Sequence, residues 1–169
     1  HGWIFKEEIK VEGGWRRVVP SPAPIDFKNA ALVERMARAG SIVITGGGGG
    51  IPVYIDEKGM LQSIEGVIDK DLASAMIGVR VKADELYVLT DVPYIYKDFR
   101  KPTQEILEFL DYEDAMKYLE AGVFGEGSMA PKIRACLHFV KNGGQKSVIT
   151  EATKLEDRRY GSKITMEYD

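Results

Sequence analysis

The sequence contains few of the residues on which several common functions depend. Only one of its 169 residues is cysteine, Cys136, and only two are histidine, His1 and His138. A single cysteine excludes an internal disulfide framework and is typical of a reducing cytoplasm. No Cys, His, Asp or Glu residues stand at zinc-binding spacing, and no Gly-x-Ser-x-Gly motif presents a nucleophilic serine. We therefore expect neither a structural metal site nor histidine-based nucleophilic catalysis.

A strong charge imbalance and a long apolar run are also missing. The 23 Lys and Arg residues against 26 Asp and Glu residues give a net charge of −3, without the basic excess of nucleic-acid-binding proteins. No stretch approaches the roughly 18 apolar residues of a membrane span. We expect a cytoplasmic protein that binds neither nucleic acid nor membrane, and this length predicts one α/β domain over residues 1–169. Because His1-Gly2-Trp3 begins without a capping or polar lead-in, we expect residues upstream, unless His1 derives from a purification tag.

Apolar runs and helical periodicity alternate along the chain, which predicts β-α-β units and a mostly parallel sheet covered on both faces. In such folds, functional residues gather at the carboxyl ends of the strands. The expected strands are Trp15–Val19, Ser41–Thr45, the hairpin of Ile51–Asp56 with Leu61–Ile64, Glu85–Val92 and Lys146–Thr150. The expected helices run from a cap at Asp26 to Ala39, from Asp71 to Val79, and over Glu105–Leu110, Asp111–Ala121 and Met129–Val140, with polar segments from Pro93 to Pro102 and after Thr150.

Glycine is in excess, at 18 of 169 residues against an average of about 7%. Five of these glycines form Gly46–Gly50, directly after an expected strand. A glycine run allows successive backbone N–H groups to approach a phosphate, but it also suits a tight crossover of the backbone. The sequence of this run matches neither a Walker A loop nor the dinucleotide-binding motif G-x-G-x-x-G. Both interpretations stay open on this run alone.

Two lysines stand at the expected starts of helices. Lys70 lies between Asp69 and Asp71, and a lysine kept charged by carboxylates could neutralise a transferred phosphoryl group. The alternative interpretation is that Asp71 is an ordinary helix cap and that its neighbours are solvated. Lys132 lies one turn into a helix that begins near Gly127-Ser128-Met129. Helix N-termini favour anions, so a lysine there indicates a bound phosphate, or else an incidental surface residue.

Three further groups of residues have a functional and a structural interpretation. Thr90-Asp91-Val92 ends a strand and precedes Tyr94 and Tyr96, which either frame a purine and its ribose or pack on neighbouring helices. Arg16 and Arg17, beside Trp15, either meet a small anion or form the polar face of an edge strand. Cys136 falls on the apolar face of its helix, which predicts an inert core thiol.

Taken together, these motifs resemble the C-terminal half of carbamate kinases, which belong to the amino acid kinase family. The order and spacing of the segments agree throughout. The matching segments are Gly14–Pro22, Gly46–Val53, Gly66–Ala73, Leu89–Val92, Lys101-Pro102 and Gly127–Lys132.

The resemblance implies the C-terminal portion of an α/β/α three-layer sandwich that transfers a phosphoryl group between ATP and carbamate. It also implies Mg²⁺, ATP or ADP as co-substrate, operation toward ATP in arginine catabolism, and a homodimer if the N-terminal half is present. The catalytic residues would be Lys70, Asp71 and Lys132, with Arg16 near the substrate. Gly47, Gly48 and Gly49 would form the phosphate or substrate loop. The residues bordering the nucleotide would be Thr90, Asp91, Val92, Tyr94, Tyr96, Gly127, Ser128 and Met129.

The family's Gly-Gly-Asn loop and His-Gly-Asn-Gly-Pro segment, both from the N-terminal half, are absent from these 169 residues. The alternative hypothesis is therefore a truncated, catalytically incomplete module that binds a nucleotide without turnover. A relative that uses another small acyl acceptor also fits. Acetylglutamate or uridylate kinase chemistry is less favoured, because Asp69-Lys70-Asp71 and Trp15-Arg16-Arg17 match carbamate kinases better.

Overall fold

The computed structural model describes residues 2–7, 12–46 and 48–167. Its largest sheet has four strands in the order β5-β9-β10-β8. Neighbouring strands β5 and β9 are parallel, as are β10 and β8, whereas β9 and β10 are antiparallel. The α/β class is thus confirmed, with a mixed sheet. The strands are β5 (Glu85–Thr90), β8 (Phe109–Asp111), β9 (Lys146–Glu151) and β10 (Ser162–Thr165).

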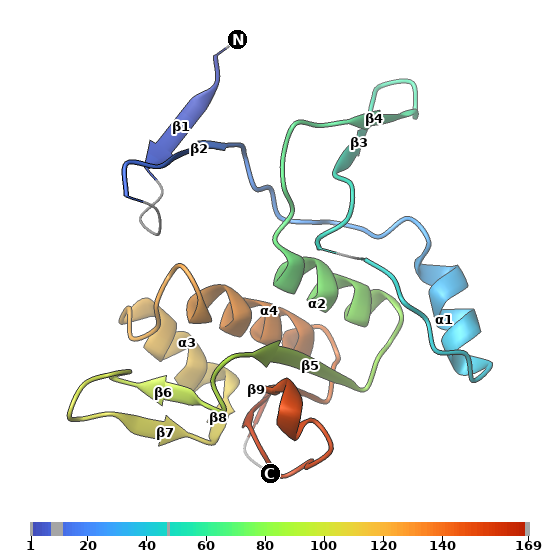
Figure 1. The fold of residues 1–169 in the computed structure, drawn as a ribbon. Helices are drawn as coiled ribbons and strands as arrows, with labels where there is room; N and C mark the ends of the chain where they lie inside the picture. Colours follow the sequence, from blue (N-terminus) through green and yellow to red (C-terminus); the bar gives the residue numbers. More distant parts are fainter. Residues whose placement is uncertain (1, 8–11, 47, 168–169) are drawn as a thin grey trace.

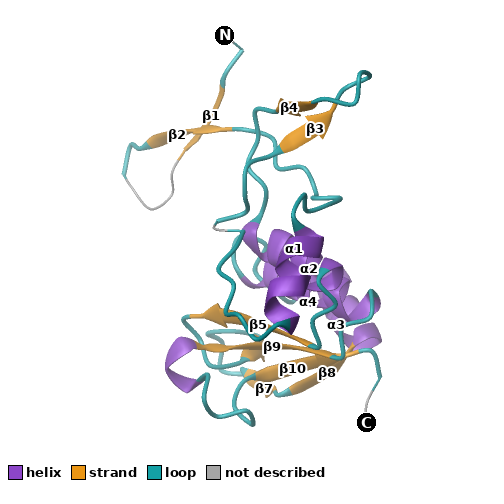
Figure 2. Cartoon of the chain, turned by 90° about the vertical axis from the view of Figure 1, so that its right-hand side faces the viewer, coloured by secondary structure: helices purple, strands orange, loops and turns teal. Residues whose placement is uncertain are grey.

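Helices α2 (Lys70–Arg80), α3 (Tyr112–Glu120) and α4 (Met129–Lys141) cover one face of this sheet. Figure 2 shows them above the strands, with α1 (Ala30–Arg38) beside them. The centre of the core is α4, which buries Ile133, Cys136 and Val140 against β9 because these apolar residues recur at helical spacing. Phe139 is also fully buried and lies between Gly78 of α2 and Gly144. A Cβ on Gly78 would stand 2.9 Å from the Phe139 ring, and a Cβ on Gly144 would stand 2.1 Å from it.

Three antiparallel hairpins complete the described strands: β1 (Ile4–Glu7) with β2 (Trp15–Val18), β3 (Val53–Ile55) with β4 (Leu61–Ser63), and β6 (Ile95–Lys97) with β7 (Glu105–Leu107). Figure 1 shows the first two above the helices and the β6–β7 hairpin beside the main sheet. Ser162 joins this third hairpin to β10. Its buried hydroxyl accepts a hydrogen bond from Ile95 N at 2.7 Å and donates one to Leu107 O at 2.6 Å.

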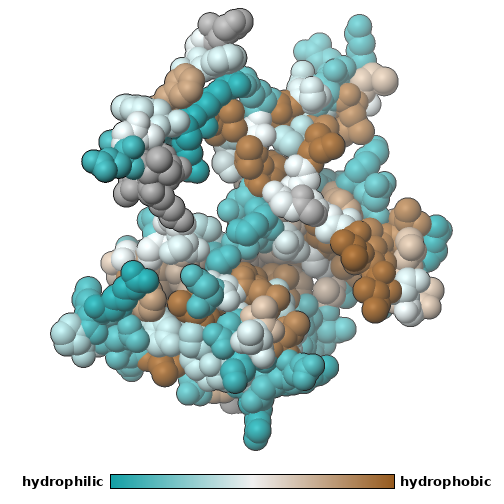
Figure 3. Space-filling view, viewed as in Figure 1, coloured by the Kyte–Doolittle hydropathy of each residue, from teal (hydrophilic) through white to brown (hydrophobic). Residues whose placement is uncertain are grey.

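The prediction of a buried strand at Ser41–Thr45 is wrong. The segment has no strand pairing, and the side chains of Ile42 and Ile44 are each 97% exposed. Figure 3 shows apolar side chains at the surface where this segment runs, beside α1. The physical reason is that no described strand lies alongside it, so the segment has neither a hydrogen-bonding ladder nor a face on which to bury its isoleucines.

The expected helix capped by Asp26 begins later, at Ala30, after Asn29. The Asp26 carboxylate accepts a hydrogen bond from Phe27 N at 2.7 Å and pairs with Arg80 Nε at 3.0 Å. This long-range ion pair takes the place of the predicted cap.

Two further segments differ from expectation. The predicted helix Glu105–Leu110 is instead β7 and the start of β8, because these short apolar runs pair with β6 and β10. The predicted polar tail contains a 3₁₀ helix, η1 (Ala152–Lys154), and strand β10, which lies between β9 and β8. None of the described helices is long and apolar enough to cross a membrane.

Candidate functional site

Helix α2 begins with a well-formed cap that brings charge to its first turn. Asp69 is the N-cap: its Oδ1 accepts hydrogen bonds from Asp71 N at 2.9 Å and Leu72 N at 3.0 Å, which satisfies two of the donors left free at a helix start. The expected cap at Asp71 is therefore wrong. Because Asp69 takes the capping role, the Asp71 carboxylate is free for other contacts.

Asp71 joins the two lysines that the sequence singled out. Its Oδ2 accepts a hydrogen bond from Lys132 Nζ at 3.0 Å and another from Lys70 Nζ at 3.3 Å. The side chains of Asp71 and Lys132 are only 11% and 13% exposed, whereas that of Lys70 is 62% exposed. Since α2 packs directly on α4, residues 61 positions apart form one cluster. The Asp69 carboxylate is held by the N–H groups of the helix start, so the two ammonium groups on Asp71 remain the groups that can attract an anion.

A cavity of about 390 Å³ opens beside this cluster. It lies at the carboxyl end of β5, where an α/β sheet places its ligands, and its far side is formed by the β6–β7 hairpin and the loop between α3 and α4. The lining residues are Thr90, Asp91, Val92, Tyr96, Phe99, Arg100, Val123, Phe124, Gly125, Ser128, Met129 and Lys132. An apolar cavity with a cation at one end suits a ligand that has a ring and an anionic group.

Most of the residues predicted to border a nucleotide line this cavity. Thr90, Asp91, Val92, Tyr96, Ser128 and Met129 all do so. Gly127 is in the same loop without lining the cavity, and Tyr94 lies outside it, where its ring packs 5.0 Å from that of Tyr160. Burial raises the pKa of Tyr96, so its hydroxyl stays protonated at neutral pH and can donate a hydrogen bond.

The glycine loop passes over the residues just before α2. A Cβ on Gly49 would meet the carbonyl oxygen of Ile68 at 2.2 Å, and the positive φ angles of Gly48 (74°) and Gly49 (111°) disfavour any larger residue. Gly47 lies outside the described residues. The loop therefore approaches the Asp69–Asp71 turn, although it lines a second, apolar groove and not the cavity beside Lys132.

Arg16 is another predicted site residue that the described structure does not place at the cavity. It lies on β2, opposite Lys6, in the hairpin that stands apart from the sheet in Figure 1. Its neighbour Arg17 stacks on the Trp3 ring at 4.4 Å and pairs with Glu65.

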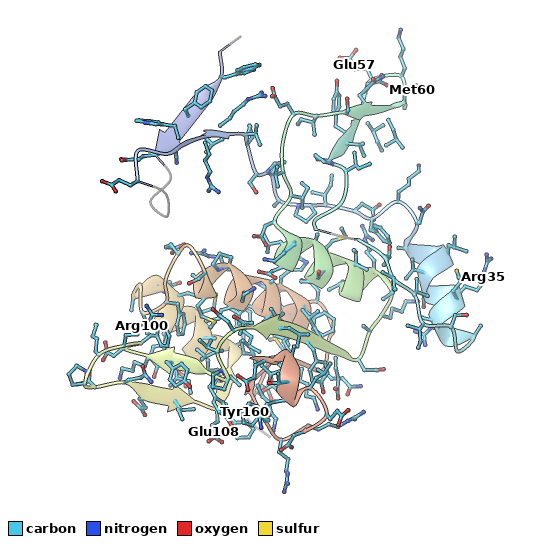
Figure 4. The ribbon with its side chains drawn as sticks, in the orientation of Figure 1. Arg35, Glu57, Met60, Arg100, Glu108 and Tyr160 are labelled. Carbon is cyan, nitrogen blue, oxygen red and sulfur yellow. The ribbon has the colours of Figure 1, made fainter. Side chains whose placement is uncertain are left out.

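Sequence reasoning did not single out Phe99 and Arg100, which form the outer wall of the cavity. The Phe99 ring stacks with Tyr96 at 5.5 Å, and the Arg100 guanidinium lies 5.2 Å from the Phe99 ring. Figure 4 places Arg100 next to the loop between α3 and α4. Both residues fall in the segment from Pro93 to Pro102, whose aromatic and basic content was the available signal.

This fold and site define an α/β protein with a lysine-lined cavity at the carboxyl end of a sheet strand. Residues 5–151 match the model of the amino acid kinase family, and the chain belongs to that family.

Two curated relatives are carbamate kinases of Thermoplasma species. The chain is 45% identical to that of Thermoplasma volcanium over 150 residues and 46% identical to that of Thermoplasma acidophilum over 151 residues. Each match covers 89% of this chain and 48% of the relative. The chain thus spans about half the length of these relatives.

Among solved structures, the carbamate kinase of Giardia lamblia bound to AMP-PNP superimposes with a TM-score of 0.87 at 32% identity. That match covers 97% of this chain and 52% of the Giardia chain. A second structure of the Giardia enzyme, bound to citric acid, gives a TM-score of 0.84.

Proposed function

We propose that this chain is the nucleotide-binding, phosphoryl-transfer portion of a carbamate kinase, which converts ATP and carbamate to ADP and carbamoyl phosphate. The observation that carries the proposal is the cluster in which Asp71 holds Lys70 and Lys132, beside a cavity of suitable size. Phosphoryl transfer depends on positioning and on neutralising charge, and this cluster provides both without a covalent nucleophile.

The two lysines have different positions and therefore different roles. Lys132 both lines the cavity and contacts Asp71, so it holds the phosphates of a nucleotide whose base lies toward Tyr96 and Phe99. Lys70 is exposed beside the cavity and faces the transferred group. Asp71 fixes the distance between them. Within this proposal, Gly47, Gly48 and Gly49 contribute the substrate loop, Arg16 approaches the acceptor, and Tyr94, Gly127 and Ser128 support the nucleotide.

Magnesium fits this site as a companion of the nucleotide. No three His, Cys, Asp or Glu side chains gather as a metal cage among the described residues, but Mg²⁺ usually needs only one or two carboxylates besides phosphate oxygens. Asp91, which lines the cavity, and Asp71 supply carboxylates there. When bound, the ion would neutralise charge on the nucleotide phosphates.

The proposal has finer parts, which the family resemblance suggests. They are operation toward ATP in arginine catabolism, a cytoplasmic location, one domain over residues 1–169, and a homodimer formed together with the N-terminal half.

The test is ATP formation from ADP, Mg²⁺ and carbamoyl phosphate by the purified chain, with ADP binding measured in parallel by calorimetry. Lys132→Ala is expected to lower kcat/KM at least about 30-fold, the equivalent of losing about 2 kcal/mol of transition-state stabilisation. Lys141→Ala, on the exposed end of the same helix, is the matched control and should leave activity unchanged.

Full activity of the Lys132 variant would remove that lysine from the site. ADP binding without ATP formation would support the alternative function, a nucleotide-binding module that lacks turnover.

A further inference from the structure

The loop between α3 and α4 forms one wall of the cavity, and the backbone hydrogen bonds that close it converge on a single carbonyl. Gly125 O accepts hydrogen bonds from the N–H groups of Ser128, Met129 and Ala130, each at 3.1 Å, so one carbonyl is shared by three donors. Ser128, the N-cap of α4, makes no side-chain capping bond. Gly125 and Gly127 flank Glu126. Because glycine has more backbone freedom than other residues, this segment loses a large conformational entropy when it becomes ordered.

Glu126, at the centre of this loop, forms a bidentate ion pair with Arg134. Arg134 Nη1 donates to Glu126 Oε2 at 2.8 Å and Arg134 Nη2 donates to Glu126 Oε1 at 2.7 Å. This hydrogen bonding lowers the pKa of the Glu126 carboxyl. The parallel arrangement fixes orientation as well as distance, so it restrains the loop more than a single contact between surface charges would.

Arg134 reaches the loop from outside the cavity. It stands two residues after Lys132 on α4, which at 3.6 residues per turn places the two side chains on roughly opposite sides of the helix. Lys132 lines the cavity and Arg134 does not. The ion pair therefore acts on Gly125, Ser128 and Met129, which touch the cavity, without touching a ligand itself.

We infer that Glu126 and Arg134 form a positioning pair, which orders the α3–α4 loop before the nucleotide arrives. This inference rests on the proposed function. The pair reduces the conformational freedom that the loop loses on binding, and this reduction favours association. Because neither residue contacts the reacting phosphate, the pair affects nucleotide affinity and leaves the rate of the transfer step unchanged.

The test compares Glu126→Gln and Arg134→Gln with the wild type at low ionic strength. Each variant should raise the Kd for ADP, and the KM for ADP in ATP formation, about three- to tenfold. The kcat should stay within about twofold of the wild-type value. Melting temperatures should stay within about 3 °C, because the side chains of Arg134 and Glu126 are 45% and 69% exposed and neither belongs to the core. Amide hydrogen exchange over residues 126–130 of the free protein should become faster.

Two matched variants separate positioning from a general charge effect. The charge-reversed double variant, Glu126→Arg with Arg134→Glu, should recover most of the lost affinity. Arg38→Gln, which breaks a single-contact ion pair with Glu34 on α1, should change neither Kd nor loop exchange.

Unchanged Kd, KM and loop exchange in both single variants would overturn the inference while leaving the proposed function in place. A fall in kcat at constant KM would also overturn it. A wild-type chain that does not bind ADP would refute the proposed function, and the inference with it.

Discussion

Lys70 and Lys132 contact the same oxygen of Asp71, yet their surroundings differ sharply. Lys132 is enclosed between α2, α4 and the cavity, whereas the Lys70 ammonium is largely in solvent. An enclosed cation loses little freedom when an anion binds, and an exposed one can follow a group that moves. This asymmetry underlies the proposal that Lys132 holds phosphates and Lys70 serves the transferred group.

At this scale we predict that Lys70→Ala lowers kcat about 100-fold, the usual effect of deleting one group that stabilises developing charge. The Kd for ADP should change less than about threefold, because Lys132 remains in place. Steady-state kinetics and calorimetry on the same preparation measure both values. Lys70→Arg, which keeps the charge, should retain more turnover than Lys70→Ala. Equal turnover in wild type and Lys70→Ala would leave Lys70 as a solvated neighbour of the Asp69 cap.

Cys136 is predicted to be chemically silent in the folded protein. Burial raises the pKa of its thiol from 9.0 to about 12, so the reactive thiolate is scarce at neutral pH. Alkylation at pH 8 should label it only after unfolding. Below about pH 9, folded and unfolded chains both keep the proton. Between pH 9 and 12 only the unfolded chain releases it, so the free energy of unfolding should fall as pH rises.

The control for this prediction is Cys136→Ala, which should lack the part of the decline that arises from this thiol. Rapid labelling of the folded wild type at pH 8 would contradict the burial of the side chain.

At the scale of elements, the sequence predicts those that carry strong local signals. Asp111 caps α3 as expected, its side chain accepting a hydrogen bond from Asp114 N at 2.7 Å. Helix α4 ends at Lys141, with Asn142 as its C-cap before a glycine. The predictions fail where pairing partners decide. Three-residue strands such as β7 give no usable period, and Ser41–Thr45 has the composition of a strand but no described partner.

The residues of the candidate site likewise fall into those that local sequence signals predict and those that they do not. Lys70, Asp71 and Lys132 were predictable, because charge at a helix start is a local signal. Phe99 and Arg100 were not, because the β6–β7 hairpin is placed by the bonds of Ser162, more than 50 residues away in the sequence. The aromatic and basic composition of the segment marks it as a candidate, but contacts at that separation decide which of its residues reach the cavity.

The packing of α2 on α4 should control the site through Gly78. Because a Cβ there would stand 2.9 Å from the Phe139 ring, Gly78→Ala should move α2 away from α4 and lengthen the contact between Asp71 and Lys132. We expect a loss of about 1–3 kcal/mol in the free energy of unfolding, as for other overpacked cores, together with weaker ADP binding. Chemical denaturation and calorimetry measure these effects.

Ser74→Ala, on the exposed side of the same helix, is the control and should change stability by less than about 0.5 kcal/mol. A Gly78→Ala variant with unchanged stability and affinity would contradict the prediction, because it would show that the Phe139 ring yields to the Cβ without movement of α2.

At the scale of the whole molecule, this chain combines a well-packed sheet with an apolar surface beside α1. Ile42 and Ile44 expose almost all of their side chains, and exposed apolar surface of this kind favours association. The chain spans about half the length of the relatives it matches.

We predict that the isolated chain self-associates through this surface. Replacing Ile42 and Ile44 together by Asp should shift the sedimentation coefficient toward that of a monomer, while the free energy of unfolding changes by no more than about 0.5 kcal/mol, because neither side chain is buried. Lys28→Gln with Arg35→Gln, at exposed charged positions nearby, changes the net charge by the same amount and controls for it. An unchanged distribution in the isoleucine variant would contradict the prediction.

The two hydrogen bonds of the Ser162 hydroxyl, to Ile95 and Leu107, set a lower limit on the length of a fragment that can bind a nucleotide. The residues that line the cavity all lie between positions 90 and 132, so a truncation series could be expected to tolerate loss of everything beyond α4 and β9. The hydroxyl that secures the outer wall comes from β10, however, and only a side chain that both donates and accepts can replace it. Progressive deletion from the carboxyl terminus should therefore abolish nucleotide binding abruptly when residue 162 is removed.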